Sequence, residues 1–368
     1  MKITSLELIY IEIPLKRPFE TSFGSISERP AIIVKVVADN GTVGYGESSP
    51  LSVPISEPET VESGMTFLSA HAPALVGIEV TPAFDVTTLY PNTSHPVSRI
   101  GLEAAYTDLV AQSLHISLAE LFGARRTSLP LGESVSLRDS VEEMKEEVRQ
   151  FIADGAQRIK LKIAPGRDIE VVEQIRAEFP DVSLGVDANA AYTATDIPLL
   201  SKLARSDIAF IEQPFEAHDL EAHAALRSKG LMVCLDESVG SLDDCRSAVE
   251  KGACDMINIK PARIGSFREA KRIHDACINA GIRLFGGGRL ETGLGKTANA
   301  AFYALSGFTD ASDITPPSAY LEMDIIEPPF AIKEGMYSIP STAGLGVAVH
   351  EEAVNRYEKE RVVLGKPL

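Results

Sequence analysis

The chain has 368 residues, 45% of them hydrophobic and 24% charged, which is typical of a soluble globular protein. At about 150 residues per domain, this length predicts two domains. The 52 acidic residues outnumber the 35 basic ones, and the net charge of −17 argues against nucleic-acid or membrane partners, because it repels phosphate backbones and anionic lipid.

Targeting segments and cysteines add little to this description. Glu7 and Glu12 interrupt the apolar core that a signal peptide would need, and no run of about 18 apolar residues predicts a membrane span. Cysteines occur at positions 234, 245, 254 and 277. They form no CxxC pair, so we interpret them as reduced thiols that fill the core. We expect a cytoplasmic protein and, as its quaternary state, a homo-oligomer.

The first third of the chain predicts strands followed by helices. Residues 3–13 alternate in the manner of a strand, and residues 30–38 form a second apolar run. The turn signal Asp39-Asn40-Gly41 precedes a returning strand over 43–47. Helical periodicity then dominates, most clearly over 99–122. This order predicts a small α+β unit.

From about residue 127, short apolar runs alternate with amphipathic stretches. The strand candidates are 130–137, 158–163, 183–188, 208–214, 232–238, 256–261 and 283–288. The helix candidates are 141–154, 168–178, 195–205, 219–229, 241–251, 266–280 and 293–306. A repeat of this kind, roughly 25 residues long, is typical of a parallel barrel or a doubly wound sheet. An eighth strand is not obvious, and we expect the tail to return to the N-terminal unit.

Ionisable residues end five consecutive strand candidates. They are Lys162, Asp187, Glu212, Asp236 and Lys260. Successive members are 25, 25, 24 and 24 residues apart, so each step is one strand–helix unit. We therefore expect all five side chains at one height, on the carboxyl-terminal rim where barrel active sites form.

The pleat of a strand places alternate side chains on opposite faces. Lys160 and Lys162 therefore share one face, and the apolar residues beside them share the other. Because the apolar set must cover the surrounding helices, both lysines are predicted to point into the barrel. By the same parity, Asn189 points with Asp187.

The three acids of this set are candidate metal ligands. Asp187, Glu212 and Asp236 would repel one another unless a cation lay between them. Oxygen donors without a nearby Cys or His suit a hard ion, so we predict Mg²⁺, with Mn²⁺ also possible. Core salt bridges could explain any one of these residues, but an active site better explains five in register with both signs.

This arrangement indicates removal of a proton next to a substrate carboxylate. A divalent cation on that carboxylate would stabilise the enediolate that forms when the proton leaves. The like-charged Lys160 and the metal should lower the pKa of Lys162 toward that of a useful base. Lys260 lies four strands further on, so the two amines should face each other across the substrate.

Five motifs resemble those of a known family. They are Lys160-Leu-Lys162, Asp187-Ala-Asn189, Ile211-Glu-Gln-Pro214, Leu235-Asp-Glu-Ser238 and Ile259-Lys-Pro261. Together they resemble the muconate-lactonizing subgroup of the enolase superfamily, and within it the o-succinylbenzoate synthases and the similar N-succinylamino acid racemases. Supporting stretches occur at 18–24, 44–47, 287–293 and 324–329, so the resemblance covers nearly the whole chain.

The resemblance implies a fold and a division into domains. It implies a TIM-like (β/α)₇β barrel over residues 127–319 as the catalytic domain. It also implies an α+β capping domain formed by residues 1–126, with residues 320–368 returning to it.

The resemblance also implies roles for individual residues. Asp187, Glu212 and Asp236 would bind Mg²⁺, and Lys162 and Lys260 would form the acid/base pair. The supporting candidates are Lys160, Asn189 and Glu237; from the residues alone, Asn189 and Glu237 could orient the ligands or make ordinary hydrogen bonds at the strand ends. The substrate-binding candidates are Thr21, Ser22, Phe23, Gly24, Gly287, Gly288, Arg289 and Glu291. The loop from Thr21 to Gly24 would close over a succinyl tail.

Two reactions of a small carboxylate substrate fit these roles. In a synthase of menaquinone biosynthesis, Lys162 would abstract the α-proton of 2-succinyl-6-hydroxy-2,4-cyclohexadiene-1-carboxylate and protonate the departing hydroxide, while Lys260 stays cationic. In a racemase of N-succinyl amino acids, both lysines would exchange protons with the substrate. We predict the synthase, with a racemase or a bifunctional enzyme as the alternative. A muconate-cycloisomerase-like enzyme and a non-catalytic barrel rank lower.

The chain departs from the family pattern at three places. Relatives usually carry Met at the position of Arg289, Gly at that of Ala262, and Arg-Tyr-Trp where this chain has Ala319-Tyr-Leu321. Arg289 could contact a substrate anion or pair with an acid such as Glu291, and we favour the pairing. These changes affect the substrate pocket and leave the metal and lysine set intact.

Overall fold

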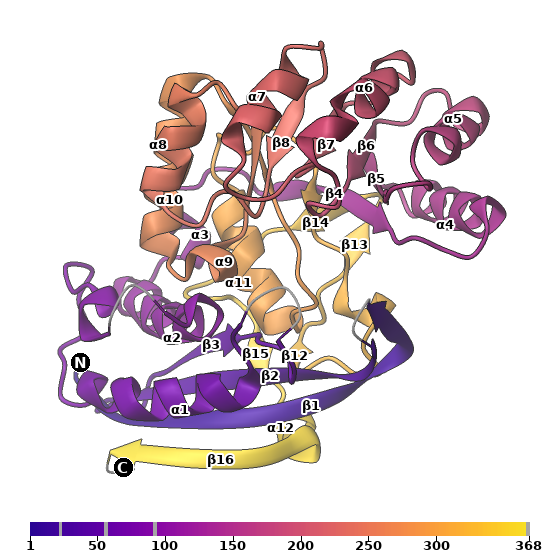
Figure 1. Cartoon of the computed structure of the whole chain (residues 1–368). Coiled ribbons are helices and arrows are strands. Elements are labelled where there is room, and N and C mark those ends of the chain that lie inside the picture. Colours follow the sequence, from indigo (N-terminus) through magenta and orange to yellow (C-terminus); the bar gives the residue numbers. More distant parts are fainter. Residues whose placement is uncertain (22–23, 55–57, 91–93, 366–368) are drawn as a thin grey trace.

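The computed structural model describes residues 1–21, 24–54, 58–90 and 94–365. It confirms the predicted fold class, a TIM-like (β/α)₇β barrel with an α+β layer packed against it. In Figure 1 the barrel lies above that layer, and both ends of the chain lie in the layer. None of the helices in the described ranges combines the length and the apolar character that a bilayer crossing requires.

The α+β layer, the cap, is built on an antiparallel sheet with the strand order β16-β1-β2-β3. Its strands are β1 (Ile3–Thr21), β2 (Gly24–Ala38), β3 (Val43–Ser48) and β16 (Glu358–Gly365). Both faces of β1 are covered, because Leu6 and Leu8 pack in the core of the cap while Ile11 and Ile13 join the core of the barrel. The first strand therefore connects the two cores.

Helices cover one face of this sheet. They are α1 (Val61–His71), α2 (Pro96–Leu114) and α3 (Leu118–Phe122), with 3₁₀ turns η1 (Ala72–Leu75) and η2 (Val86–Leu89). The stretch over 99–122, where helical periodicity is clearest, thus lies in two helices. The chain breaks at His115, whose φ of 56° lies in the left-handed region, and Ser117 then caps α3.

The barrel strands agree with the predicted ones to within a few residues. They are β4 (Ser128–Val135), β5 (Arg158–Lys162), β6 (Leu184–Asp187), β7 (Phe210–Glu212), β8 (Val233–Leu235), β9 (Met256–Ile259) and β10 (Arg283–Gly286). The eighth strand, β11 (Ser312–Asp313), pairs with β4 in parallel. On its other side, the Gly286 N–H of β10 donates to Ser312 Oγ over 3.0 Å, which closes the barrel.

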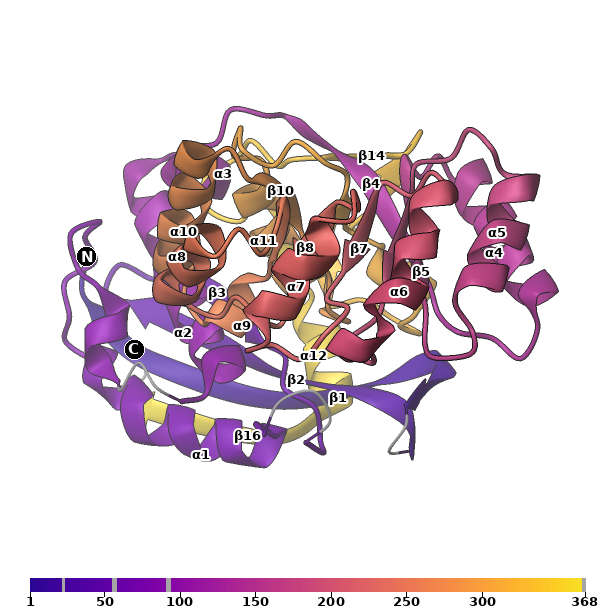
Figure 2. The same ribbon diagram turned by 45° about the horizontal axis from the view of Figure 1, so that its top comes forward.

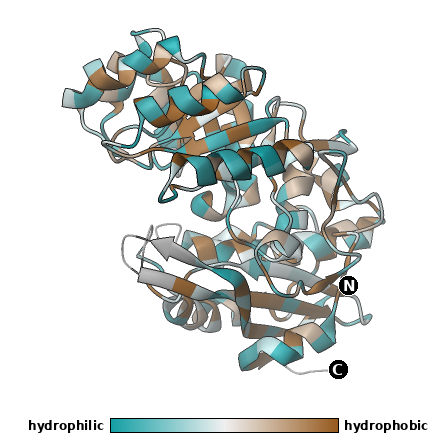
Figure 3. Ribbon diagram, turned by 90° about the vertical axis from the view of Figure 1, so that its right-hand side faces the viewer, coloured by the Kyte–Doolittle hydropathy of each residue, from teal (hydrophilic) through white to brown (hydrophobic). Residues whose placement is uncertain are grey.

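Helices surround these strands, as Figure 2 shows for α4 to α8 and α10. They are α4 (Val141–Ala153), α5 (Ile169–Glu178), α6 (Ile197–Leu200), α7 (Leu220–Arg227), α8 (Leu242–Glu250), α9 (Pro261–Ile264), α10 (Phe267–Ala280) and α11 (Gly293–Tyr303). The 3₁₀ turns η3 (Ala194–Asp196) and η4 (Ser201–Arg205) flank α6. Hydrophobic strands and hydrophilic outer helix faces can be followed in Figure 3. The four cysteines are buried and unpaired.

The tail contacts both layers. It contains η5 (Pro317–Ala319), β12 (Ile326–Glu327), β13 (Ile332–Lys333), β14 (Met336–Ser338), β15 (Ala348–Val349) and α12 (Glu351–Tyr357). β14 pairs antiparallel with β4 of the barrel, whereas β16 pairs with β1 of the cap. The tail was expected at the N-terminal unit, and its contact with the barrel was not predicted.

Candidate active site

The five strand-end residues lie on consecutive parallel strands. Lys162, Asp187 and Glu212 are direct register partners across β5, β6 and β7. Asp236 immediately follows β8, and Lys260 immediately follows β9. The spacing of about one strand–helix unit therefore places all five at the carboxyl-terminal rim of the barrel.

Lys162 and Lys260 contact different carboxylates. Lys162 Nζ lies 2.7 Å from Asp187 Oδ2, and Lys260 Nζ lies 2.7 Å from Asp236 Oδ2. The lysine side chains are 32% and 15% exposed, whereas those of Asp187 and Asp236 are 2% and 0% exposed. The amines therefore lie closer to solvent than their acidic partners.

Lys160 lies deeper in the barrel and contacts three acids. Its Nζ lies 2.7 Å from Glu212 Oε2, 2.9 Å from Asp313 Oδ2 and 3.7 Å from Asp187 Oδ2. The ammonium group also lies 5.3 Å from the centre of the Phe285 ring. Burial alone would lower the pKa of Lys160, but the surrounding carboxylates raise it well above its usual value. Lys160 is therefore a fixed cation.

Arg263 is a further member of the site that the sequence analysis did not single out. It lies on α9, three positions after Lys260, and its Nη1 bonds to Asp236 Oδ1. Burial alone would raise the pKa of Asp236, but Arg263 and Lys260 hold it well below its usual range. The only sequence signal was its position after the Lys-Pro pair that starts α9. Lys160, Lys162, Asp187, Glu212, Asp236, Lys260 and Arg263 are referred to below as the rim cluster.

Asn189 links Lys162 to Glu237 by hydrogen bonds. The Lys162 ammonium donates to Asn189 Oδ1, and Asn189 Nδ2 donates to Glu237 Oε1 over 3.2 Å. Asn189 has a φ of 41°, in the left-handed region that asparagine tolerates better than most residues. Among the described residues, Glu237 Oε2 is buried without a hydrogen-bond partner, and burial together with the charge of Asp236 raises its pKa.

Gln213 belongs to a motif already noted, but its role could not be predicted. Its Oε1 accepts the backbone N–H of Asp236 over 2.9 Å and that of Ser238 over 3.2 Å. Its Nε2 donates to Ser238 Oγ over 2.7 Å. Gln213 thus joins the end of β7 to the end of β8 and fixes the backbone that carries Asp236.

Gly287 and Gly288 pass directly beside the cluster. A Cβ atom at Gly287 would lie 2.2 Å from Asn258 Oδ1 and 2.4 Å from Lys260 Cε. One at Gly288 would lie 2.5 Å from the carbonyl oxygen of Asp313. The missing side chains therefore let this loop approach the lysine closely.

Glu291 lies behind this loop and is held by the chain itself. Its Oε2 accepts the backbone N–H of Arg289 over 3.0 Å, and its Oε1 accepts Asn299 Nδ2 over 3.1 Å. Lys296 Nζ lies 3.4 Å away. Burial alone would raise the pKa of Glu291, but Lys296 and neighbouring arginines lower it. The described contact is made by the backbone of Arg289, and the favoured pairing of its side chain with Glu291 stays a prediction.

The predicted loop over the substrate is described only at its ends. Thr21 closes β1 and pairs with Gly24, the first residue of β2. Ser22 and Phe23 lie outside the described residues. In Figure 1 this end of the hairpin curves up toward the barrel.

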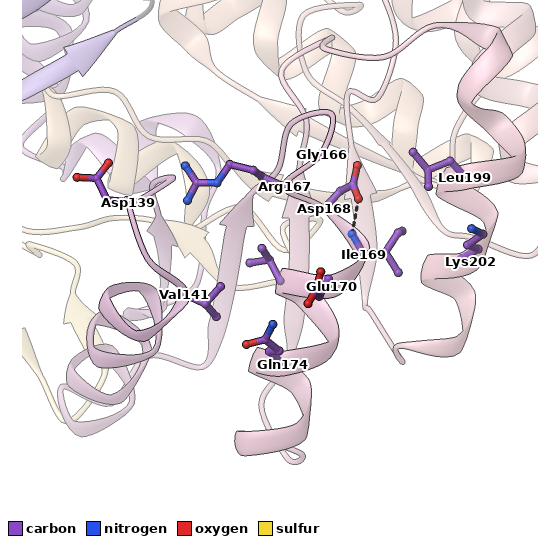
Figure 4. A pocket seen from close by; sticks show the side chains of 11 residues that line it. Asp139, Val141, Gly166, Arg167, Asp168, Ile169, Glu170, Gln174, Leu199 and Lys202 are labelled. Atoms are coloured by element: carbon purple, nitrogen blue, oxygen red, sulfur yellow. Dashed lines mark hydrogen bonds between the residues drawn. The ribbon is translucent and has the colours of Figure 1, made fainter.

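A cavity of about 440 Å³ lies beside the starts of α4 and α5 and is lined by none of the rim cluster (Figure 4). Arg167 and Lys202 face it together with Asp139 and Glu170, so both charge signs are present. Asp168 turns back to accept the Ile169 N–H at the start of α5. These groups do not favour one class of ligand.

The chemistry of the rim acids fits a hard divalent cation. Asp187, Glu212 and Asp236 supply only oxygen donors from strands about 4.8 Å apart. Burial and the charge of Asp187 raise the pKa of Glu212 to about 7. A cation between these carboxylates would reduce their mutual repulsion. In their present positions, however, no three His, Cys, Asp or Glu side chains of the described residues gather closely enough to hold an ion. Lysine and arginine groups bind these oxygens and would have to move.

The pKa of Lys162 differs from the expectation. Burial alone would lower it, but the adjacent Asp187 carboxylate outweighs burial and the charge of Lys160, so the pKa is raised. The expected lowering of this pKa rested on Lys160 and a bound metal, and the contact with Asp187 could not be foreseen from the sequence. The acid beside the ammonium therefore outweighs the effects on which the expectation rested.

Known proteins resemble this chain over nearly its full length. Residues 143–353 match the family described as enolase C-terminal domain-like, and residues 5–123 match the N-terminal domain of mandelate racemase / muconate lactonizing enzyme. The chain is 36% identical to o-succinylbenzoate synthase of Bacillus subtilis (strain 168) over 97% of each protein. It is 37% identical to N-succinylamino acid racemase of Amycolatopsis sp, over 99% of this chain and all of that protein. A solved enolase superfamily structure from Listeria innocua Clip11262 superposes with a TM-score of 0.94 at 33% identity, over 99% of both chains.

Proposed function

Because this chain belongs to the mandelate racemase / muconate lactonizing enzyme family of the enolase superfamily, we propose that it is an o-succinylbenzoate synthase. The reaction would be loss of water from 2-succinyl-6-hydroxy-2,4-cyclohexadiene-1-carboxylate, a step of menaquinone biosynthesis. Relatives with this activity in Bacillus subtilis and Enterococcus faecalis are 36% and 34% identical to the chain. Their similarity over nearly the whole length supports the proposal.

The observation that carries the proposal is a difference in solvent exposure: two lysine ammonium groups are partly exposed, and the carboxylates that they contact are buried. Lys162 and Lys260 are 32% and 15% exposed, while their partners Asp187 and Asp236 are almost fully buried. A substrate that enters the rim therefore meets two ammonium groups first. Such groups bind a carboxylate and, once neutral, accept a proton from the adjacent carbon.

The acids of the rim cluster would hold Mg²⁺, or Mn²⁺ in its place. Asp187, Glu212 and Asp236 are the residues suited to this role, since they lie on adjacent strands and supply oxygen donors. When bound, the ion supplies positive charge that stabilises the negative charge developing on the substrate carboxylate.

Lys162 would move the proton, and Lys260 would stabilise charge. Neutral Lys162 takes the α-proton, and the electron pair left on that carbon expels the hydroxyl group from the neighbouring carbon. The Lys162 ammonium then returns its proton to the departing hydroxide, and one water is released. Lys260 remains an ammonium beside Asp236 and stabilises the negatively charged oxygen of the substrate. Asn189 steadies Lys162 through the hydrogen bond described above.

The alternative is an N-succinylamino acid racemase, or one enzyme with both activities. Named racemases of Amycolatopsis sp and Thermus thermophilus are 37% and 36% identical to the chain, as similar as the synthases. Two amines from different strands favour this reading, because one could remove the proton and the other return it to the opposite face.

The test is an assay of the purified protein with both substrates. We expect water loss from the cyclohexadiene carboxylate with Mg²⁺, and loss of that activity with EDTA. Incubation of N-succinyl amino acids in D₂O then separates the alternatives, since α-deuterium incorporation requires a racemase half-reaction. Turnover of neither substrate, or full turnover in EDTA, would refute the proposal.

A further inference from the structure

Asp313 enters the barrel from a strand that the sequence did not reveal. It is the second residue of β11 and pairs with Gly132 of β4. Its side chain is 12% exposed, and its Oδ2 accepts Lys160 Nζ over 2.9 Å. Its Oδ1 accepts Arg158 Nη2. Asp313 is therefore an acid next to the rim cluster but on the far side of Lys160 from the predicted metal ligands.

Arg158 fixes Asp313 in this position. A Cβ atom at Gly132 would lie 2.2 Å from Arg158 Nη2, so the glycine leaves the space that the guanidinium occupies. Arg158 also donates to the carbonyl oxygen of Ala311 over 2.9 Å and lies 4.9 Å from the centre of the Phe285 ring. Burial alone would raise the pKa of Asp313, but Lys160 and Arg158 hold it well below its usual range. The carboxylate therefore stays charged.

Lys160 shares two of its three acids with the proposed metal site. Glu212 and Asp187 lie 2.7 and 3.7 Å from its Nζ, and both are candidate ligands. An incoming divalent cation would compete for these oxygens and repel the ammonium group, since both are positive. Lys160 is only 3% exposed, so its charge cannot retreat into water, and an unpaired buried charge is costly.

The other two lysines do not face this difficulty. Lys162 is 32% exposed and has Asn189 as a second partner, and Lys260 is 15% exposed. Each can swing toward solvent or substrate when an ion takes its carboxylate. Lys160 differs from them because it is enclosed and because an acid outside the ligand set, Asp313, contacts it directly.

We propose that Asp313 is a positioning residue that retains Lys160 inside the barrel when a divalent cation takes over Glu212 and Asp187. Metal binding then leaves no unpaired buried ammonium. The inference rests on the metal site of the proposed function. It adds to that site a residue, Asp313, that keeps Lys160 paired when the ion binds.

The test measures Mn²⁺ binding to the whole protein without substrate, by the EPR signal of free Mn²⁺. Asp313→Asn leaves Lys160 with only the metal ligands as acids, so we expect Mn²⁺ affinity to fall by about tenfold or more, a coupling typical of buried charged neighbours. In the double variant Lys160→Met/Asp313→Asn, the competing ammonium is absent, and affinity should return to within about threefold of the wild type. A residue that only supports the fold would show no such restoration.

Asp108→Asn is the matched control, because it also removes a buried carboxylate. Asp108 lies in α2 of the cap and accepts the backbone N–H groups of Tyr45 and Leu345 over 3.0 and 2.8 Å. This variant should lower the melting temperature and leave Mn²⁺ affinity unchanged. Far-UV circular dichroism checks the fold of every variant.

Wild-type affinity in Asp313→Asn, or a double variant as weak as the single one, would overturn the role of Asp313. If Asp313→Asn does not fold, Lys160→Met decides: the proposal requires Mn²⁺ affinity at least equal to the wild type, and weaker binding overturns it. A wild-type protein that binds no Mn²⁺ would instead count against the metal site of the proposed function.

Discussion

The rim cluster and the contact between cap and barrel both bury charged residues, but they pair them differently. In the rim cluster, side chains bind side chains, as in Lys162 with Asp187 and Lys260 with Asp236. At the contact between cap and barrel, here the seam, the charged residues Arg29, Glu47, Arg99 and Glu103 bind mainly backbone groups.

The seam contacts hold ends of helices and loops. Glu47 of β3 accepts the N–H groups of Thr292 and Gly295 at the start of α11, over 3.0 and 2.9 Å. Glu103 of α2 accepts two N–H groups at the start of α10, each over 3.1 Å. Arg29 donates to the carbonyl oxygen of Leu290 over 2.7 Å. Anions at helix N-termini also complement the helix dipole.

This difference separates a region whose contacts can be exchanged during function from one whose contacts stay in place. A side-chain partner can rotate away, so a metal ion or substrate can replace it in the rim cluster. A backbone N–H at a helix end cannot rotate away in this manner. If the acid that accepts its hydrogen bond is lost, the buried N–H is left unsatisfied. We therefore expect substitutions in the rim cluster to change activity and substitutions in the seam to change stability.

The largest effect is expected from a substitution in the rim cluster. Lys162→Ala removes the proposed base, so turnover should fall by about 10²–10⁴-fold while the circular dichroism spectrum and Mn²⁺ binding remain close to the wild type. Steady-state kinetics with Mg²⁺ measure the loss. Lys251→Ala, at an exposed pair with Glu221, is the control and should keep full activity. Full activity of Lys162→Ala would contradict the assignment of the base.

The next effect breaks the seam. Glu103→Ala leaves two N–H groups of α10 without their acceptor, so the free energy of unfolding should fall by about 2–4 kcal/mol. The kcat of the folded protein should change little. Urea unfolding and kinetics at 25 °C measure the two quantities, and Glu173→Ala, an exposed acid on α5, should change the stability by less than about 0.5 kcal/mol. A seam variant that lost activity but not stability would remove the distinction between the regions.

The smallest effect is expected in the pH dependence of stability, through Glu47 of the seam. Burial, assisted by the charge of Glu291, raises the pKa of Glu47 from 4.5 to about 7. The folded protein therefore holds this proton to a higher pH than the unfolded chain does. Its contribution to stability is full below about pH 4.5 and is lost as the pH rises through 7. Between pH 5 and 8, Glu47→Gln should remove roughly 1–3 kcal/mol of the decline in unfolding free energy. Parallel stability curves for the two proteins would show that Glu47 does not titrate in this range.

Periodicity predicted the barrel well because each strand–helix unit carries several agreeing signals. For α10, the helix predicted over 266–280 begins at Phe267 and ends at Ala280, between the cap Ser266 and the left-handed Gly281. The helical periodicity over 99–122 did not show where one helix ends and the next begins, because the break at His115 depends on one left-handed residue.

The rest of the site depended on contacts between distant segments. β11 has two residues, too few to show a pattern, so Asp313 could not be connected with Lys160. Arg263 contacts Asp236 from α9, a short helix of four residues that follows Lys260, and this contact joins segments distant in the sequence. The pKa of Lys162 follows from the acid beside its ammonium, which strand spacing cannot reveal.

The pairing of β16 with β1 has a consequence for synthesis on the ribosome. Ser5 pairs with Gly365 and Leu8 with Val362, so the first strand of the cap meets its outer partner only after the barrel has been translated. Until then the edge of β1 exposes unpaired backbone groups that could join another chain. In a nascent chain, the barrel segment would therefore be fully synthesised while the sheet of the cap still lacks β16.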